Sequence, residues 1–390
     1  MKPLSERTNR LAQSDIRAIS ILIKEHGGVN LGQGICDMPT PTPIKEAAKA
    51  AIDGDESIYS HFAGIAELRD GLVEKAQRFN GLPVEGPDDV MVSSGSTGAF
   101  MCAMLGLLDR GDEVILFEPF YGYHRNMLSL LGVDMRFVKT TAPDWSIDFD
   151  ALEAAITDRT KVILVNTPGN PHGKVWTKAE LERLLGLLEK YDLYALTDEI
   201  YEHMLYDGRS HVSLASLEGA YERTVTISGF SKTFNMTGWR MGYAVGPQRL
   251  IQPMGLINDL VYICAPTPLQ HGVTRGLTMG QSYYDNMLVD YEKKRTMMCD
   301  ALEAAGFQAN RPQGAYYVLA DYSGLRTRFE GFDHDHMAAR TLVDRAGVGA
   351  VAGRSFFENP DDGKDFLRFC YAKEFDVLAN ACDLLVDAFA

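Results

Sequence analysis

The chain has 390 residues, 46% of them apolar and 23% charged, which is the composition of an ordinary soluble globular protein. A chain of this length can form two domains. The formal net charge of −15 argues against nucleic acid as the main partner, because proteins that bind a phosphate backbone do so with basic surfaces.

The N-terminal part of the chain predicts helices separated by short irregular segments. Residues 9–26 alternate apolar and charged positions at helical spacing, and the pattern stops at two glycines. A short strand or turn is expected over 29–34, followed by a proline-rich stretch. Two further helices are expected over 43–53 and 65–78.

From residue 88 to residue 246, short apolar segments alternate with segments of helical periodicity such as 178–191. Continuous apolar strands between helices are typical of a mostly parallel sheet covered on both faces. Ligands of such sheets bind at the carboxyl ends of the strands. The predicted strands are 90–93, 113–117, 161–165, 194–197, 224–227 and 241–245.

The C-terminal part predicts a long helix over 284–305, a strand over 315–320, a helix over 335–346, a strand over 366–371 and a last helix. The predicted fold class is therefore α/β, with a large domain built on a mostly parallel sheet covered by helices and a smaller α+β domain.

The domain boundaries follow from these patterns. We predict that residues 1–45 form an N-terminal arm and part of the small domain. Residues 46–283 are expected to form the large domain, and residues 284–390 the small C-terminal domain.

Apolar stretches, cysteines and histidines argue against a membrane span, a secreted protein and a metal site. The longest apolar stretch, 100–108, is interrupted by Gly106 and is shorter than the ~18 residues of a membrane span. The first 25 residues carry charges throughout, so no signal peptide is expected. The six cysteines form no CxxC pair, which indicates reduced thiols in a cytoplasmic protein. His334 and His336 lack a second ligand cluster, so we expect a solvated helix start and no metal site.

The segment 228–243 reads Ser-Gly-Phe-Ser-Lys-Thr-Phe-Asn-Met-Thr-Gly-Trp-Arg-Met-Gly-Tyr and places Lys232 directly after Ser231 and eight residues before Arg240. A lysine among apolar residues loses its proton more easily than a free one, and the neutral amine can form a Schiff base with an aldehyde. A hydroxyl and a guanidinium nearby suit one phosphate group. An aldehyde that carries a phosphate describes pyridoxal phosphate (PLP). The alternative is a solvated surface lysine.

Two strand ends supply groups that suit the same ligand. The strand over 90–93 runs into Ser-Gly-Ser-Thr-Gly-Ala at 94–99, a turn of small residues that opens a helix and can bind a phosphate through backbone N–H groups. The segment 118–123, Glu-Pro-Phe-Tyr-Gly-Tyr, follows another strand. Its Tyr121 can stack on a planar ring or belong to the core.

Two further strand ends carry an amide and an acid. The segment 166–173, Asn-Thr-Pro-Gly-Asn-Pro-His-Gly, presents Asn170 in a turn, where its amide can donate to oxygens of a cofactor and of a substrate carboxylate. Asp198 follows the apolar strand over 194–197 and can pair with a pyridine nitrogen or cap a helix. A protonated pyridine ring is an electron sink, which is the chemistry that PLP provides.

Arg368 lies in the apolar segment Phe-Leu-Arg-Phe-Cys-Tyr at 366–371. A guanidinium in an apolar strand needs an anion. A bidentate clamp on the α-carboxylate of an amino acid fits this position, and an internal salt bridge is the alternative.

Together these motifs resemble the fold-type I PLP-dependent aminotransferases of class I/II, in particular the kynurenine, glutamine and methionine aminotransferases. Two more segments carry the resemblance, Gly-Gln-Gly-Ile-Cys-Asp at 32–37 and Tyr-Ser-His-Phe-Ala-Gly at 59–64. The motifs stand in order over about residues 5 to 385, which makes the combination far more specific than any single motif. The resemblance implies PLP as cofactor, amino acid and 2-oxo acid substrates, and a homodimer with shared active sites.

The resemblance also implies a role for each matching residue. Lys232 holds PLP as a Schiff base, and Tyr59 reaches the phosphate of the neighbouring subunit's cofactor. The implied catalytic residues are Lys232, Asp198 and Tyr201, and those implied in binding the substrate are Gly34, Asn170 and Arg368. Those implied in binding the cofactor are Tyr59, Gly95, Ser96, Thr97, Tyr121, Asn170, Asp198, Tyr201, Ser231, Lys232 and Arg240.

The sequence departs from the family pattern at two positions. Gly229 stands where many relatives have a phosphate-binding serine, so the hydroxyl is expected from Ser231 or Ser228, and we favour Ser231. Thr97 stands where some relatives that bind dicarboxylic amino acids have a lysine, which argues against an aspartate pocket of that kind. A pocket for an uncharged or aromatic side chain is suggested by Ile35, Tyr123, His124 and Tyr262.

We therefore expect an aminotransferase that moves the amino group of an L-amino acid to a 2-oxo acid. The alternative within enzymes is a PLP-dependent β-lyase acting on cysteine conjugates. A transcription regulator with an aminotransferase-like domain is disfavoured, because the motifs begin by residue 30 and leave no room for a DNA-binding domain ahead of them.

Overall fold

The computed structural model describes residues 2, 5, 7 and 15–390. The part of the first predicted helix before residue 15 therefore lies outside the described residues, and the remainder forms α1 (Asp15–His26). None of the helices in the described part of the chain combines the length and apolar character that a membrane crossing requires.

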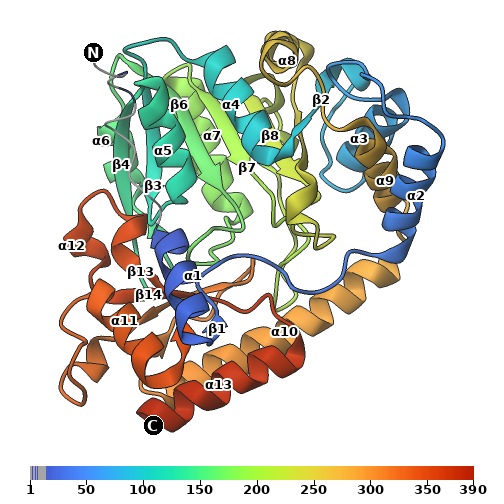
Figure 1. Ribbon diagram of the computed structural model, residues 1–390. Helices are drawn as coiled ribbons and strands as arrows, with labels where there is room; N and C mark the ends of the chain where they lie inside the picture. The colour runs from blue at the N-terminus through green and yellow to red at the C-terminus, as the bar shows by residue number, and fades with distance from the viewer. Residues whose placement is uncertain (1, 3–4, 6, 8–14) are drawn as a thin grey trace.

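A large eight-stranded sheet lies at the centre of the upper part of the molecule (Figure 1). Its strands are β2 (Val90–Ser94), β3 (Glu113–Glu118), β4 (Asp134–Thr141), β5 (Ser146–Ile147), β6 (Thr160–Asn166), β7 (Tyr194–Asp198), β8 (Thr224–Gly229) and β9 (Met241–Val245). They lie in the order β2-β9-β8-β7-β6-β3-β4-β5. The neighbours from β8 to β4 run parallel, whereas β9 runs antiparallel to both β2 and β8, and β5 antiparallel to β4.

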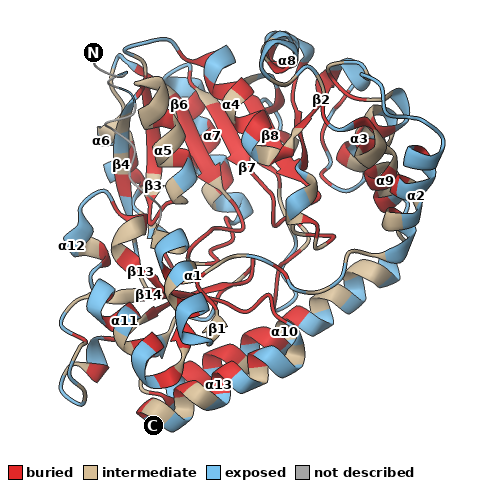
Figure 2. Cartoon of the chain, viewed as in Figure 1, coloured by how far each residue is buried: buried red, intermediate tan, exposed pale blue. Residues whose placement is uncertain are grey.

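Strand β6 shows why these apolar segments form such a sheet. Its Val162 and Leu164 belong to one core cluster and its Ile163 and Val165 to another, because successive side chains point to opposite faces. The helices around this sheet are α2 (Thr42–Asp53), α3 (Ala66–Arg78), α4 (Gly95–Leu107), α5 (Gly122–Leu131), α6 (Phe149–Ala155), α7 (Lys178–Lys190), α8 (Gln248–Tyr262) and α9 (Thr267–Leu277). One cluster is completed by α4, α5 and α8 and the other by α6 and α7, so the strands are buried on both faces (Figure 2).

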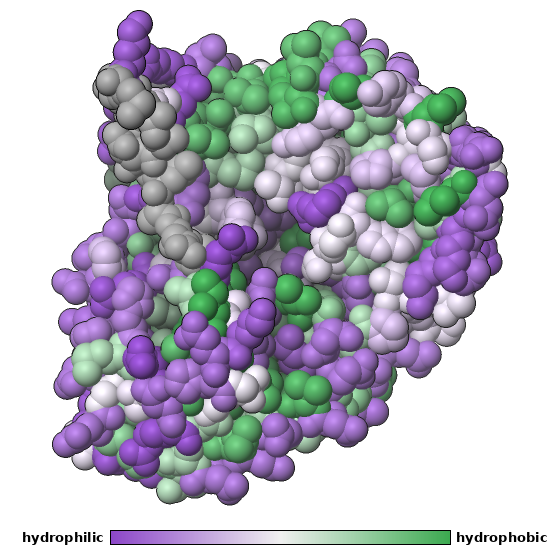
Figure 3. Space-filling view, viewed as in Figure 1, coloured by the Kyte–Doolittle hydropathy of each residue, from purple (hydrophilic) through white to green (hydrophobic). Residues whose placement is uncertain are grey.

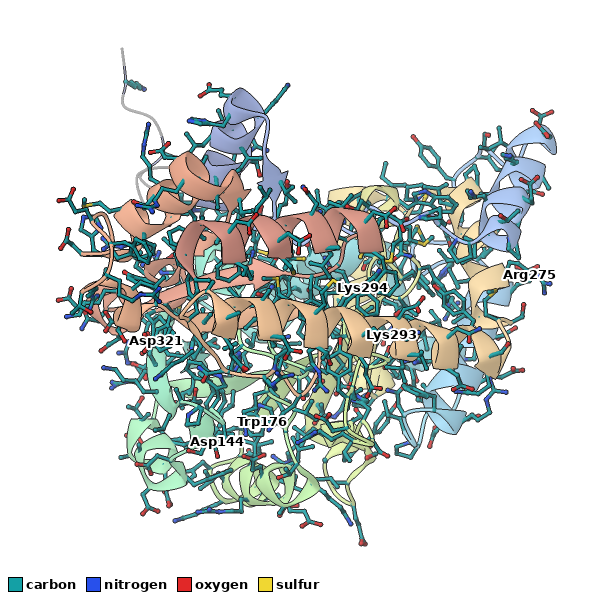
Figure 4. All side chains as sticks on the ribbon, turned by 90° about the horizontal axis from the view of Figure 1, so that it is seen from below. Asp144, Trp176, Arg275, Lys293, Lys294 and Asp321 are labelled. Atoms are coloured by element: carbon teal, nitrogen blue, oxygen red, sulfur yellow. The ribbon has the colours of Figure 1, made fainter. Side chains whose placement is uncertain are left out.

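A second, antiparallel sheet of four short strands lies below the first, in the order β10-β11-β14-β13. These strands are β10 (Gln308–Ala309), β11 (Tyr317–Asp321), β13 (Val351–Ala352) and β14 (Phe366–Cys370). The N-terminal β1 (Val29–Asn30) pairs in parallel with β12 (Val348–Gly349), so the two ends of the chain meet here. The helices of this part are α1, α10 (Gln281–Ala304), α11 (Asp335–Ala346), α12 (Pro360–Gly363) and α13 (Phe375–Phe389). Seen from below, α10 and α13 lie side by side (Figure 4).

The predicted fold class is confirmed, and each predicted strand of the large sheet is present. The sequence analysis did not name β4, β5, α8 or α9 as separate elements. We propose that the two sheets are the cores of two domains with the predicted boundaries, 46–283 and 284–390, with 1–45 contributing to the smaller one. The pairing of β1 with β12 supports this division.

A glycine of β9 permits the closest approach between the large sheet and the turn that opens α4. A Cβ atom on Gly242 would lie 2.2 Å from the Ser96 backbone nitrogen and 2.4 Å from the Gly95 carbonyl carbon. Because these are backbone atoms, they cannot move aside by a side-chain rotation. The turn therefore requires glycine at this position.

We expect Gly242→Ala to lower the free energy of unfolding by at least ~1–3 kcal/mol, the usual cost of overpacking. Gly186→Ala is the control, because Gly186 lies in α7 with no atom within 4 Å of an added Cβ. That substitution should stabilise the helix by up to ~1 kcal/mol. Urea unfolding followed by circular dichroism measures both. Equal stability of Gly242→Ala and the wild type would contradict the close approach.

Candidate active site

A cavity of about 390 Å³ lies where the strands of the large sheet end. Strands β2, β3, β6, β7 and β8 are followed by segments that line it, and β9, which runs the other way, begins there. Residues from the second sheet and the N-terminal segment close the opposite side, among them Arg368 of β14 and Gly34. The predicted site residues found on its wall are Gly34, Ser96, Thr97, Tyr121, Asn170, Asp198, Tyr201, Ser231, Lys232, Arg240 and Arg368.

The start of α4 forms one end of this cavity. No side chain caps the N-terminus of α4, so its first backbone N–H groups have no side-chain acceptor. Gly95 has φ +72°, and a Cβ there would lie 2.4 Å from a guanidinium nitrogen of Arg240. Ser96, Thr97 and Arg240 all line the cavity. A helix N-terminus, two hydroxyls and a guanidinium form a suitable anion site.

The backbone of Arg240 is in the left-handed region, with φ 57° and ψ 51°. This conformation is uncommon for residues other than glycine, and such strained residues recur at ligand-binding sites. The guanidinium donates to the Thr237 carbonyl at 3.0 Å and has no carboxylate partner among the described residues. It therefore remains available to an anion.

Ser231 and Ser228 differ in where they lie. Ser231 lines the cavity. The Ser228 hydroxyl instead donates to a Glu202 carboxylate oxygen at 2.7 Å, away from the cavity. A Cβ on Gly229 would lie 2.7 Å from the Ser96 hydroxyl oxygen and 3.1 Å from Gly242 Cα, so a serine does not fit there without rearrangement. The geometry thus favours Ser231 over Ser228 as the phosphate-side hydroxyl.

Lys232 extends into the cavity from the segment after β8. Its Nζ donates to the Gly34 carbonyl at 3.1 Å and lies 5.9 Å and 5.6 Å from the ring centroids of Tyr201 and Tyr316. Burial lowers the pKa of the Lys232 ammonium, and the nearby Arg368 cation acts in the same direction. A larger fraction of this amine is therefore neutral at a given pH than for a free lysine.

Asp198 is paired with a histidine that the sequence analysis had assigned to the side-chain pocket. His124 Nε2 lies 3.0 Å from one carboxylate oxygen of Asp198, and the other oxygen accepts from the Ile200 N–H at 3.3 Å. His124 packs between the ring of Phe100, at 4.7 Å, and that of Tyr121, at 5.1 Å. No helix begins at Asp198, so the helix-cap alternative is wrong.

His124 thus contacts the Asp198 carboxylate and also lines the cavity. A histidine directly after Tyr123 was the only sequence signal, and that position does not identify its partner. Ile35 and Tyr123 lie on the cavity wall as expected. Tyr262 is not among the described residues of one chain that line the cavity.

Arg368 is buried, with 1% of its surface exposed, and has no carboxylate partner among the described residues. Its terminal nitrogens donate to the Asn170 side-chain oxygen at 2.9 Å and to the Gly32 carbonyl at 2.5 Å, and its Nε has no partner. Its guanidinium carbon lies 4.4 Å from the ring centroid of Tyr317. The internal salt bridge considered above is therefore absent, and the buried charge remains available to an anion.

Three tyrosines differ in position. Tyr121 lines the cavity, and burial raises the pKa of its phenol. Tyr201 donates its hydroxyl to Tyr317 at 3.1 Å, a partner that the sequence did not predict. Tyr59 does not line the cavity and is 77% exposed. Its predicted contact is with the cofactor phosphate of a neighbouring subunit.

These residues fit PLP. The wall carries three cations, Lys232, Arg240 and Arg368, whereas Asp198 is the sole carboxylate among the described lining residues. One PLP molecule carries a phosphate, a pyridine nitrogen and an aldehyde. The anion site at α4 suits the phosphate, Asp198 suits the nitrogen, and the Lys232 amine suits the aldehyde. The buried Arg368 on the same wall would suit a second anion, such as a substrate carboxylate.

Metal-binding groups lie elsewhere. In the part of the chain that the structure describes, only Glu199, Glu202 and His211 are close enough together to hold an ion. His334 is the N-cap of α11, and its ring accepts from the Met337 N–H, as expected for a helix start.

Comparison with known proteins agrees with this site. Residues 26–385 match a family model described as aminotransferase class I and II. The chain is 31% identical to bovine kynurenine–oxoglutarate transaminase 3 over 93% of its length and 85% of the relative. It is 35% identical to aspartate/prephenate aminotransferase of Thermus thermophilus over 91% and 92% of the two chains. The structure of N-succinyldiaminopimelate aminotransferase from Mycobacterium tuberculosis superposes with a TM-score of 0.94, at 30% identity over 99% and 100% of the chains.

We expect Lys232 to be the lysine that PLP modifies. Because burial lowers its pKa, its amine should react at a pH below that needed by exposed lysines. Incubation of the cofactor-free protein with PLP over pH 6–9, borohydride reduction and peptide mapping would locate the label. Lys178→Ala is a control, because Lys178 is an exposed lysine on α7. A reduced label on any other lysine in preference to Lys232 would contradict the assignment.

Proposed function

The chain belongs to the class I and II aminotransferases and is a PLP-dependent transaminase, and from this premise we propose that the residues gathered around Lys232 carry out the transfer of an amino group from an L-amino acid to a 2-oxo acid. The observation that carries this proposal is the amine of Lys232 in one cavity with Asp198 and the unpaired Arg368. The relatives are named as transferases, and the alternative of a β-lyase gains no support from them.

We assign the phosphate of the cofactor to the start of α4. The backbone of Gly95, the hydroxyls of Ser96, Thr97 and Ser231, and the guanidinium of Arg240 would hold it. Tyr121 would stack on the ring, and Asn170 and Tyr201 would face the oxygen substituent of the ring. When bound, PLP supplies an aldehyde that combines with amines and a ring that withdraws electrons from the substrate α-carbon.

Asp198 would keep the ring nitrogen protonated. Its carboxylate is fixed by the Ile200 N–H on one oxygen and His124 on the other, so it presents its charge in one orientation. Lys232 would take the proton from the substrate α-carbon and return it during transfer, because its lowered pKa leaves a neutral amine available.

Arg368 would bind the α-carboxylate of every substrate, with Asn170 and Gly34 beside it. Binding of the α-carboxylate at Arg368 would fix the orientation of the substrate α-carbon relative to Lys232. The rest of the wall would meet the substrate side chain, and it is formed by uncharged residues: Ile16, Ile35, Phe100, Tyr123 and Met127. We therefore propose an aromatic or other uncharged amino acid as donor.

Each protomer would act as part of a cytoplasmic homodimer. Large apolar residues are exposed on α8 and on the loop before α3, with Leu260 85%, Ile58 73% and Tyr59 77% exposed. Figure 3 shows the apolar surface over α8 at the top of the molecule. A patch of this kind is typical of a protein interface, and Tyr59 within it could then reach the partner's phosphate site. All six cysteines are free thiols, which supports a reducing compartment.

A panel of donors and acceptors, read by the absorbance of the bound cofactor, tests the reaction and the donor class. We expect aromatic and aliphatic donors to react better than aspartate or glutamate, and amino-group transfer to a 2-oxo acid in place of release as ammonia. Pyruvate and ammonia formed without an acceptor would instead indicate the β-lyase.

Arg368→Lys should weaken all donors about equally, by ~2–4 kcal/mol, because each presents the same carboxylate and lysine cannot form two parallel bonds. Cofactor affinity should be unchanged. Arg110→Lys, at an exposed arginine outside the cavity, is the matched control. A loss confined to acidic donors would mean that Arg368 contacts the side chain instead.

Leu260→Asp should shift the protein from dimer to monomer and weaken PLP binding, because a charge would be buried in the interface and the partner's Tyr59 would be lost. Val289→Asp, at an apolar residue on α10 that is 48% exposed, should leave both unchanged. Sedimentation velocity and cofactor titration measure the two effects. A Leu260→Asp protein that stays dimeric would place the interface elsewhere.

A further inference from the structure

A second cavity, here called the back cavity, lies behind the segment that carries Lys232. Its volume is about 720 Å³, larger than the 390 Å³ of the active-site cavity and within the range of small-molecule sites. It is enclosed by the end of α3, the loop 202–211, the segment 229–234 and the start of α10. Neither the family-derived roles nor the proposed reaction uses it.

The two cavities share one wall. Ser231 and Lys232 line the active-site cavity, whereas the flanking Gly229, Phe230 and Thr233 line the back cavity. A molecule in the back cavity would therefore contact the residues on either side of the reactive lysine.

The open charge of the back cavity is positive. The one carboxylate on its wall, Glu202, is already satisfied: one oxygen accepts from Lys75 at 2.5 Å and Asn80 at 2.8 Å, and the other from Ser228 at 2.7 Å. Although burial alone would raise its pKa, Lys75 lowers the pKa of this carboxyl well below its usual range. Arg78 is an exposed residue at the end of α3 that lines the cavity, and it has no hydrogen bond or ion pair with any described residue.

Two further groups on the wall can contact a ligand, and only the first suits an anion. The α10 helix begins there at Gly280 and Gln281, and among the described residues no side chain caps its N-terminus. The side chain of His211 is 4% exposed, and its Nε2 donates to Glu199 at 2.7 Å, so Nδ1 of the neutral ring is an acceptor that has no partner among the described residues. A buried nitrogen without a partner is a cost that a ligand can remove.

The remaining wall is aromatic and apolar. Phe79, His203 and Tyr284 form a row, with His203 at 4.2 Å from the first ring and 4.6 Å from the second. Burial lowers the pKa of His203 to about 4, so this ring is uncharged near neutral pH. Phe230 and Leu288 extend the apolar surface. Such a wall suits a flat organic body.

A metal ion is a poorer occupant. Glu199, Glu202 and His211 do converge within 4.8 Å of one another. However, Glu199 also accepts from Thr197 and Ser213, each at 2.9 Å, so the oxygens of both acids are already used by protein donors. The Arg78 guanidinium and the backbone N–H groups at the start of α10 remain open, and these groups favour an anion over a metal ion.

We propose that the back cavity is a second binding site, distinct from the active site, for a small organic anion with an aromatic or apolar body. The anionic group lies at Arg78 and the uncapped start of α10, and the body lies against Phe79, His203 and Tyr284. Glu202 on its wall holds the Ser228 hydroxyl, and the Ser228 carbonyl accepts from Ser96 of the phosphate turn at 3.0 Å. Ser228 thus links Glu202, on the wall of the back cavity, to Ser96 in the turn that opens α4.

The test uses the PLP-loaded enzyme and three probes measured by isothermal titration calorimetry: 2-naphthoate, 2-naphthyl phosphate and the uncharged 2-naphthamide. We expect at least one of the two anions to bind at two classes of site and the amide to bind the second class at least tenfold more weakly. Comparison of the two anions identifies whether the head group is a carboxylate or a phosphate. No second class with either anion up to millimolar concentration would overturn the proposal.

Variants distinguish the two cavities. Arg78→Ala should weaken the second class about tenfold, Arg78→Lys should largely restore it, and Arg110→Ala should have no effect. Leu288→Trp, which fills the apolar wall, should also remove the second class. Arg368→Lys should weaken the first class alone. If Arg78→Ala and Leu288→Trp leave all binding unchanged, or if Arg368→Lys removes both classes, the probes occupy the active site and the proposal is wrong.

Discussion

The close packing around Ser96 is the constraint on which the rest of the site depends. Three glycines permit it: a Cβ on Gly242 would overlap the Ser96 backbone, one on Gly229 would crowd its hydroxyl, and one on Gly95 would meet Arg240. These glycines lie on β9, on β8 and at the start of α4, so the sheet and the helix meet with almost no side-chain volume between them. That contact places the uncapped end of α4, Arg240 and the Lys232 segment around one space.

The unpaired charges in that space favour ligand binding at the expense of the stability of the empty protein. Arg368 is buried against neutral partners, the Asn170 amide oxygen and the Gly32 carbonyl. Among the described residues, the Gly34 carbonyl is the one hydrogen-bond acceptor of Lys232. A buried cation without an anion costs free energy in the empty protein. Anionic ligands that enter the cavity recover this cost, which couples binding of cofactor and substrate to the stability of the site.

The N-terminal segment that closes the cavity is held by the second sheet and its helices. Lys373 donates to the Ile35 carbonyl at 3.1 Å, and the Glu374 N–H donates to Asp37 at 2.7 Å. Lys294 of α10, labelled in Figure 4, donates to the Met38 sulfur at 2.9 Å. Because this segment also supplies Gly34, the substrate side of the site depends on contacts between the two ends of the chain.

The sequence by itself determined six strands of the large sheet, their mostly parallel arrangement and the residues at their carboxyl ends, because continuous apolar runs, glycine turns and strand-end polar residues are local patterns. It also indicated that Arg368 needs an anion, since an arginine between apolar strand residues has no local partner. Only the tertiary structure decided which serine faces the cavity, that His124 binds Asp198, that Tyr262 lies off the cavity wall of its own chain, and that a second cavity lies behind Lys232. These are contacts between residues far apart in the chain, and local spacing carries no information about them until the sheet order and the approach of α4 to β9 are fixed.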